Sequence, residues 1–144
     1  MEPTPDAALW LGGTGDLLHF ERLFEHSIGA IVDLAFEELR PSIPRDIIYC
    51  RFPLNDGGGN PYGILRLAVE TVAALASVPV TTLVCCSAGM SRSPTIAAYA
   101  IATRTGESPE SVLLRIGEHA SLESNQALWN DVTQACQALL RSGT

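Results

Sequence analysis

The residues best suited to chemistry are a cysteine and an arginine that stand six positions apart, Cys86 and Arg92. The residues between them are mostly small: Ser87, Ala88, Gly89, Met90 and Ser91. A buried strand is predicted before this segment and a helix after it, so the loop amides and the helix N-terminus can surround one anion. Arg92 can add a bidentate fork on two phosphate oxygens. The spacing therefore predicts a phosphate-binding site formed by the backbone of residues 87–92 and the Arg92 side chain.

Cys86 is the candidate nucleophile, because the electric field that binds an anion also stabilises a thiolate. Cysteines at a helix N-terminus beside an arginine are commonly reactive near neutral pH. We therefore expect Cys86 to attack phosphorus. Ser93 directly follows Arg92. It can hydrogen-bond the sulfur and help it leave in a second step, a role compatible with capping the next helix.

Phosphoryl transfer also needs an acid for the leaving oxygen, and Asp56 is the candidate. It lies in the glycine-rich loop 55–61, thirty residues before Cys86, directly after a predicted strand. If the two strands are neighbours, both loops emerge at the same edge of the sheet. Asp56 then protonates the leaving oxygen and afterwards helps to activate water. The alternative is an ordinary turn residue in an Asn-Asp-Gly stretch.

Short apolar runs alternate with segments of helical periodicity along the whole chain. Strands are predicted at 9–12, 28–35, 47–52 and 80–86, and helices at 16–26, 61–77, 93–106, from 108 onward and around 128–139. Asn60 and Pro61 suit a helix start, as cap and first-turn proline. The pattern predicts an α/β fold with a central, mainly parallel sheet of about four to five strands flanked by helices and a helical C-terminal third. We expect a single domain over residues 1–144.

Composition and charge exclude several kinds of function. The net charge is −7, and all nine basic residues are arginine, so a lysine Schiff base and a Walker-type phosphate loop are absent. No basic stripe suits nucleic acid or anionic lipid, and no apolar run is long enough for a membrane span. The four cysteines and three histidines lack metal-ligand spacing, so neither a metal nor a cofactor is expected. No export signal is visible, and a cytoplasmic location is expected.

Residues 86–94 read Cys-Ser-Ala-Gly-Met-Ser-Arg-Ser-Pro. This segment, together with Asp56 upstream, resembles the small (atypical) dual-specificity branch of the cysteine-based protein tyrosine phosphatases. The resemblance extends from Leu9 through Ile116. It implies a metal-free, two-step mechanism through a phosphocysteine intermediate. It also implies a protein or peptide substrate carrying phosphotyrosine, with phosphoserine and phosphothreonine as further candidates, in a shallow pocket. The loop lacks the lysines of phosphoinositide-specific relatives, so an inositol lipid is not expected.

The chain departs from that family at one position, where Cys85 replaces the histidine that usually precedes the nucleophile. The departure leaves the reactivity of Cys86 open. Cys85 is expected to point away from Cys86 into the core, since side chains alternate along a strand. A redox partner for Cys86 is the alternative, with Cys50 a better candidate than Cys85. Cys136 is expected to be a core residue.

Two other functions stay open from the sequence. A rhodanese-like sulfurtransferase also has a cysteine at the start of an anion-binding loop, but its chemistry needs no acid equivalent to Asp56. An inactive phospho-binding module would use the same loop without turnover. The physiological substrate and the oligomeric state do not follow from the sequence.

Overall fold

The computed structural model describes residues 1–39, 41–88, 91–118 and 125–142. A five-stranded sheet forms its centre, in the order β1-β2-β5-β3-β4. The strands are β1 (Glu2–Pro3), β2 (Leu9–Gly13), β3 (Ala30–Ala35), β4 (Ile48–Leu54) and β5 (Thr82–Cys86). β2, β5, β3 and β4 pair in parallel, and only the short β1 is antiparallel. The expected α/β fold with a mainly parallel sheet is confirmed.

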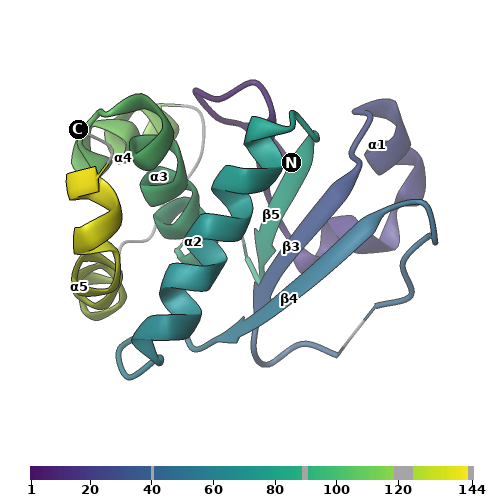
Figure 1. The fold of residues 1–144 in the computed structure, drawn as a ribbon. Coiled ribbons are helices and arrows are strands. Elements are labelled where there is room, and N and C mark those ends of the chain that lie inside the picture. Colours follow the sequence, from purple (N-terminus) through teal and green to yellow (C-terminus); the bar gives the residue numbers. More distant parts are fainter. Residues whose placement is uncertain (40, 89–90, 119–124, 143–144) are drawn as a thin grey trace.

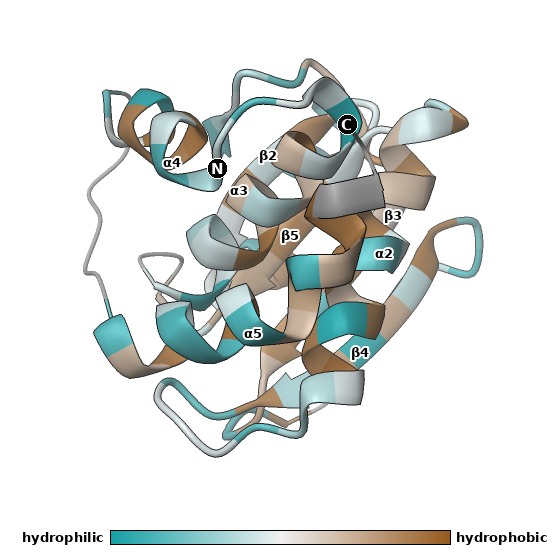
Figure 2. Ribbon diagram, turned by 60° about the vertical axis from the view of Figure 1, so that its left-hand side comes forward, coloured by the Kyte–Doolittle hydropathy of each residue, from teal (hydrophilic) through white to brown (hydrophobic). Residues whose placement is uncertain are grey.

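Helices cover both faces of this sheet. They are η1 (Thr14–Leu18), α1 (Phe20–Glu25), α2 (Tyr62–Ser77), α3 (Arg92–Thr105), α4 (Pro109–Gly117) and α5 (Gln126–Ser142). Figure 1 shows α2 to α5 gathered on one side, with α1 and η1 on the other. Figure 2 shows mostly apolar residues on the central strand β5 and polar residues on the outward side of α5. The larger core lies under α2 to α5, and a smaller one under η1 and α1.

The structure corrects two details of the predicted helices. The helix expected at 16–26 is split into η1 and α1 at His19, whose φ of −120° and ψ of 75° are not helical. Asn60 was expected to cap the helix that follows it. Instead α2 begins after Pro61 with no side-chain cap bond. The buried Asn60 side chain bonds the backbone of Asn55 and Gly57 and closes the loop before α2.

The parallel arrangement brings the C-terminal ends of β2, β3, β4 and β5 to one edge of the sheet. In such sheets the loops that leave this edge form the ligand site. Here they include the segments after Ala35, after Leu54 and after Cys86. α3 starts at the same edge and is the most enclosed helix, since every residue from Arg92 to Ala102 is buried. The predicted nucleophile and arginine thus stand on two rigid, buried elements.

Candidate active site

Cys86 is the last residue of β5 and is 2% exposed. Its sulfur accepts a hydrogen bond of 2.9 Å from the hydroxyl of Ser93, in the first turn of α3. The buried α3 fixes the position of this hydroxyl. A hydroxyl that donates to sulfur can stabilise the negative charge that the sulfur takes up when it leaves phosphorus. The contact predicted from the sequence between these two residues is therefore present.

Arg92 opens α3 and is 4% exposed, so its charge must be paired. One terminal nitrogen, NH1, donates to the carbonyl of Leu54 at 2.8 Å. Both terminal nitrogens donate to the carboxylate of Glu37, at 3.1 Å from NH1 and 2.6 Å from NH2. The buried Nε has no hydrogen-bond partner among the described residues. NH2 also donates to the Ser87 hydroxyl at 3.3 Å, so Glu37, Leu54 and Ser87 occupy both terminal nitrogens, and Nε is the donor of Arg92 that is left for an anion.

Glu37 is the main site residue that the sequence did not reveal. It follows β3, and its side chain is 49% exposed. The hydrogen bond from Arg92 holds the pKa of Glu37 at about 2, against a smaller opposing effect of burial and with help from Ser87. Burial is the largest single effect on the pKa of Arg92 and lowers it, but Glu37, Cys86 and Asp56 together outweigh burial and raise the pKa of that guanidinium. The pair is a bidentate, charge-assisted contact that fixes the plane of Arg92.

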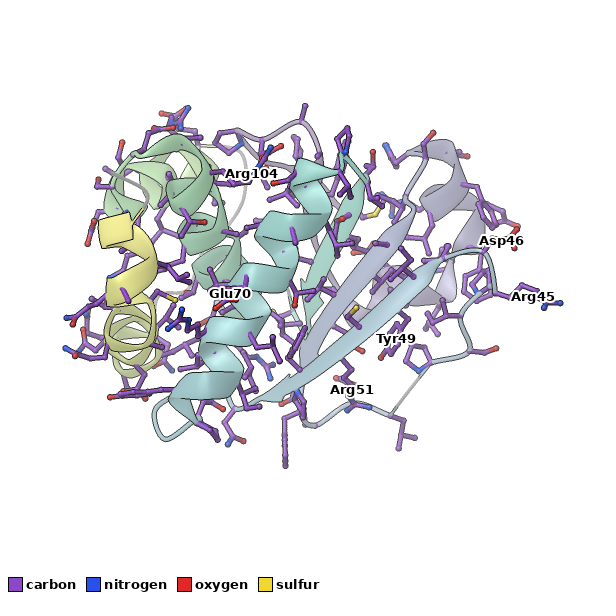
Figure 3. All side chains as sticks on the ribbon, viewed as in Figure 1. Arg45, Asp46, Tyr49, Arg51, Glu70 and Arg104 are labelled. Carbon is purple, nitrogen blue, oxygen red and sulfur yellow. The ribbon has the colours of Figure 1, made fainter. Side chains whose placement is uncertain are left out.

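A second arginine holds the segment that carries Glu37. Arg51 lies on β4 beside the end of β3 (Figure 3). Its NH2 donates to the carbonyls of Ala35 and Glu38 at 3.0 and 2.7 Å, and a longer contact reaches Phe36. These bonds join the backbone on both sides of Glu37 to the sheet. Glu37 thus reaches Arg92 from a segment that the neighbouring strand restrains.

The other predicted phosphate ligands divide into two groups. Ser87, Ala88 and Ser91 lie between Cys86 and α3, and the Ser87 hydroxyl donates to Glu37. Gly89 and Met90 lie outside the described residues. The anion-binding role of the loop amides stays a prediction for all of them.

Asp56 lies where the prediction required, in the loop after β4 and against the loop after β5. Its Oδ1 accepts a hydrogen bond of 2.8 Å from the hydroxyl of Ser91. Contrary to the assumption made from the sequence, β4 and β5 are not neighbours, because β3 lies between them. All three strands are parallel, so the two loops still leave the same edge of the sheet. Asp56 is exposed, and its carboxylate can meet a substrate bound at Arg92. The structure therefore brings together Cys86, Arg92, Ser93 and Asp56.

The loop that carries Asp56 is fastened to α5 by residues that the sequence analysis did not single out. Asn125 Nδ2 donates to the Asp56 carbonyl at 3.0 Å, and Asp131 accepts from the Gly59 amide at 3.0 Å. Asn125 also caps α5 through its Oδ1, which accepts from the Leu128 amide. Gly59 has a φ of +90°, a backbone conformation that favours glycine. The helical C-terminal third thus supports the predicted acid.

The positions of the other three cysteines favour structural roles over chemical ones. Cys85 and Cys86 lie in the cores on opposite faces of the sheet, as predicted, and burial raises the pKa of the Cys85 thiol well above its usual value. Cys136 is buried in the larger core, as predicted. Cys50 pairs with Val32, and Val32 pairs with Val84, two residues before Cys86. Cys50 and Cys86 are therefore separated by two inter-strand spacings across the sheet and by two residues along the strands. This places their Cα atoms about 12 Å apart, which is too far for a disulfide.

Within the described ranges, no three His, Cys, Asp or Glu side chains gather in a way that could hold a metal ion. None of the helices described is both long and apolar enough to cross a bilayer.

Comparison with solved structures identifies the fold. The chain matches human DUSP28 with a TM-score of 0.85 at 18% identity, over 99% of each chain. It matches DUSP15 with a TM-score of 0.81 at 24% identity, over 99% of this chain and 94% of that one. A mouse putative dual specificity phosphatase complexed with zinc tungstate gives a TM-score of 0.82 at 20% identity, over 94% of this chain and 86% of that one. No protein-family model and no curated protein sequence matches. The chain has the fold of the small dual-specificity phosphatases.

Proposed function

We propose that the protein is a phosphomonoester hydrolase of the dual-specificity type, acting on phosphotyrosine and also on phosphoserine or phosphothreonine in proteins. One observation carries the proposal. A cysteine sulfur hydrogen-bonded by Ser93, a buried arginine whose Nε has no hydrogen-bond partner among the described residues, and an aspartate on a nearby loop meet at one edge of the sheet. The fold of the small dual-specificity phosphatases supports it. Residues 1–144 form one catalytic domain in this proposal.

The first chemical step transfers the phosphoryl group to the enzyme. The Cys86 thiolate attacks phosphorus, the P–S bond forms, and the bond to the leaving oxygen breaks. Arg92 and the loop amides of residues 87–92 hold the non-bridging oxygens, where the charge of the transition state is spread. Protonated Asp56 gives its proton to the leaving oxygen, which departs as an alcohol or a phenol.

The second step regenerates the enzyme. Ionised Asp56 takes a proton from a water molecule, whose oxygen attacks the phosphorus of the phosphocysteine. The P–S bond breaks, and the sulfur leaves as a thiolate stabilised by the Ser93 hydroxyl. Inorganic phosphate is released, and Asp56 again carries its proton. The two steps together balance in atoms and charge without a metal or a cofactor.

The charges near the site support a phosphoprotein as the substrate. Glu37 and Asp56 flank the site, and Arg51 is bonded to backbone carbonyls. A highly charged inositol lipid would meet these acids with few compensating cations. We propose a phosphorylated protein or peptide as partner, neither nucleic acid nor membrane, in the cytoplasm.

The test is phosphate release from p-nitrophenyl phosphate without metal, across pH, by the wild type, Cys86→Ser and Asp56→Asn. We expect turnover in the wild type, none in Cys86→Ser, and slower turnover without the basic limb of the pH profile in Asp56→Asn. A wild type that binds vanadate or a phosphopeptide without turnover would favour the phospho-binding module. Transfer of sulfur from thiosulfate to cyanide would favour the sulfurtransferase.

A further inference from the structure

Ser91 stands at the N-cap of α3 but does not cap the helix. Its φ and ψ are −130° and −68°, its carbonyl accepts from the Thr95 amide, and its side chain makes no capping hydrogen bond. An N-cap serine normally accepts a hydrogen bond from the amide two or three residues on. Three residues on is Pro94, which has no N–H. The sequence therefore removes one of the two usual partners of this hydroxyl.

The Ser91 hydroxyl instead donates to Oδ1 of Asp56, across a separation of 35 residues. Ser91 is only 8% exposed, so little water competes for this hydrogen bond. The donor belongs to the loop that runs from Cys86 to Arg92, and the acceptor belongs to the loop after β4. This bond is a direct link between the predicted phosphate-binding loop and the predicted acid.

The link suits an acid that must present one particular oxygen. A protonated carboxyl has one oxygen that carries the proton and one that only accepts. Oδ1 accepts from Ser91 whether Asp56 is protonated or ionised, so the proton is directed to Oδ2. Asn125 holds the Asp56 backbone carbonyl at the same time. Two separate elements, α3 and α5, thus fix the backbone and the carboxyl group of Asp56.

We propose that Ser91 is the positioning residue for Asp56, holding Oδ1 so that Oδ2 delivers the proton to the leaving oxygen. The inference rests on the proposed phosphatase function. The Ser91 hydroxyl acts through Asp56 and not on phosphate itself. The effect of Ser91 on the rate therefore depends on how strongly departure of the leaving oxygen requires a proton from Asp56.

The experiment compares p-nitrophenyl phosphate, which has a good leaving group, with phenyl phosphate, which has a poor one. Removal of one hydrogen bond to a carboxyl group predicts a loss of roughly tenfold in kcat for Ser91→Ala on phenyl phosphate. On p-nitrophenyl phosphate the loss should be less than about threefold, because a good leaving group depends little on general acid catalysis. Inhibition by vanadate should not change. In the Asp56→Asn background, Ser91→Ala should have no further effect.

Matched variants separate the hydroxyl from its surroundings. Ser91→Thr and Ser91→Val have nearly the same shape, and only the threonine keeps a donor, so Thr should exceed Val on phenyl phosphate alone. Ser77→Ala removes an exposed serine hydroxyl at the far end of α2 and serves as the control. Thermal denaturation of each variant reports whether it is folded, and the Thr and Val pair carries the test if Ser91→Ala is unstable.

Three results would overturn the inference while leaving the proposed function in place. They are equal losses on both esters, a further loss in the Asp56→Asn background, and weaker vanadate inhibition in Ser91→Ala. Each would mean that Ser91 serves phosphate binding or the loop itself. A wild type that releases phosphate from neither ester would instead overturn the proposed function, and the role of Ser91 with it.

Discussion

Replacing Glu37 with glutamine tests whether this carboxylate braces the phosphate-binding arginine. The change keeps the shape of the side chain and removes its charge from Arg92. Lowering the pKa of Glu37 from 4.5 to about 2 corresponds to about 3 kcal/mol at full strength. Because the side chain is 49% exposed, solvent screening reduces this to about 1–1.5 kcal/mol. For a domain of this size we expect the melting temperature of Glu37→Gln at pH 7 to fall by about 3–6 °C.

The sign of the pH dependence follows from the lowered pKa. The folded protein binds the Glu37 proton more weakly than the unfolded chain, so the ion pair stabilises fully above the unfolded value of 4.5. This stabilisation is lost as the pH falls through about 2. Urea denaturation of both proteins should therefore show a gap at neutral pH that narrows between pH 4.5 and 2. Equal stabilities at pH 7, or a gap that does not narrow, would refute the ion-pair argument.

The same variant decides whether Glu37 supports catalysis or competes with the substrate. If Glu37 fixes the plane of the guanidinium, its loss should lower kcat/KM on p-nitrophenyl phosphate about tenfold, the cost of one weakened charge-assisted contact. Exposed Glu25→Gln on α1 is the matched control and should leave kcat/KM unchanged. A rise in kcat/KM with tighter vanadate binding would show that the carboxylate occupies the site of the phosphate.

Three further predictions follow from the site. Asp131→Ala removes the hydrogen bond that anchors the loop of Asp56 to α5. The kcat on phenyl phosphate should fall about threefold to tenfold, and inhibition by inorganic phosphate should not change. Weaker inhibition by phosphate would contradict a role limited to the acid loop. Ser93→Ala should slow the second step about tenfold, which would be seen as a burst of p-nitrophenolate before a slow steady state. A burst rate that falls as much as the steady-state rate would argue against the role of Ser93 in helping the sulfur leave. Peroxide should oxidise Cys86 without forming a disulfide to Cys50, and peptide mapping that found this disulfide would contradict the strand register.

The parts of the site that lie close together in the sequence could be predicted from it. Cys86, Arg92 and Ser93 occupy one strand end and one helix start, so local structure places them together. Asp56 required a further assumption, that its strand is a neighbour of the strand of Cys86. That assumption was wrong, because β3 lies between β4 and β5, but the parallel sheet still brings both loops to one edge.

The supporting residues could not be predicted, because their partners are far away in the chain. Glu37 meets Arg92 across 55 residues, and Asn125 meets the Asp56 carbonyl across 69. No local periodicity or spacing encodes such pairs. Asn60 shows the opposite difficulty, since its type and position suit a helix cap but its side chain closes the preceding loop instead. Local preference there is outweighed by the hydrogen bonds that the loop needs.

The most direct test of the account is to trap the covalent intermediate. The wild type and Cys86→Ser would be mixed with p-nitrophenyl phosphate, quenched rapidly and digested, and the peptides examined by mass spectrometry. We predict one phosphoryl group on Cys86 in the wild type, more of it in Ser93→Ala, and none in Cys86→Ser together with no turnover. Phosphate release that survives in Cys86→Ser, or a phosphoryl group on another residue, would contradict the assignment of Cys86 as the nucleophile.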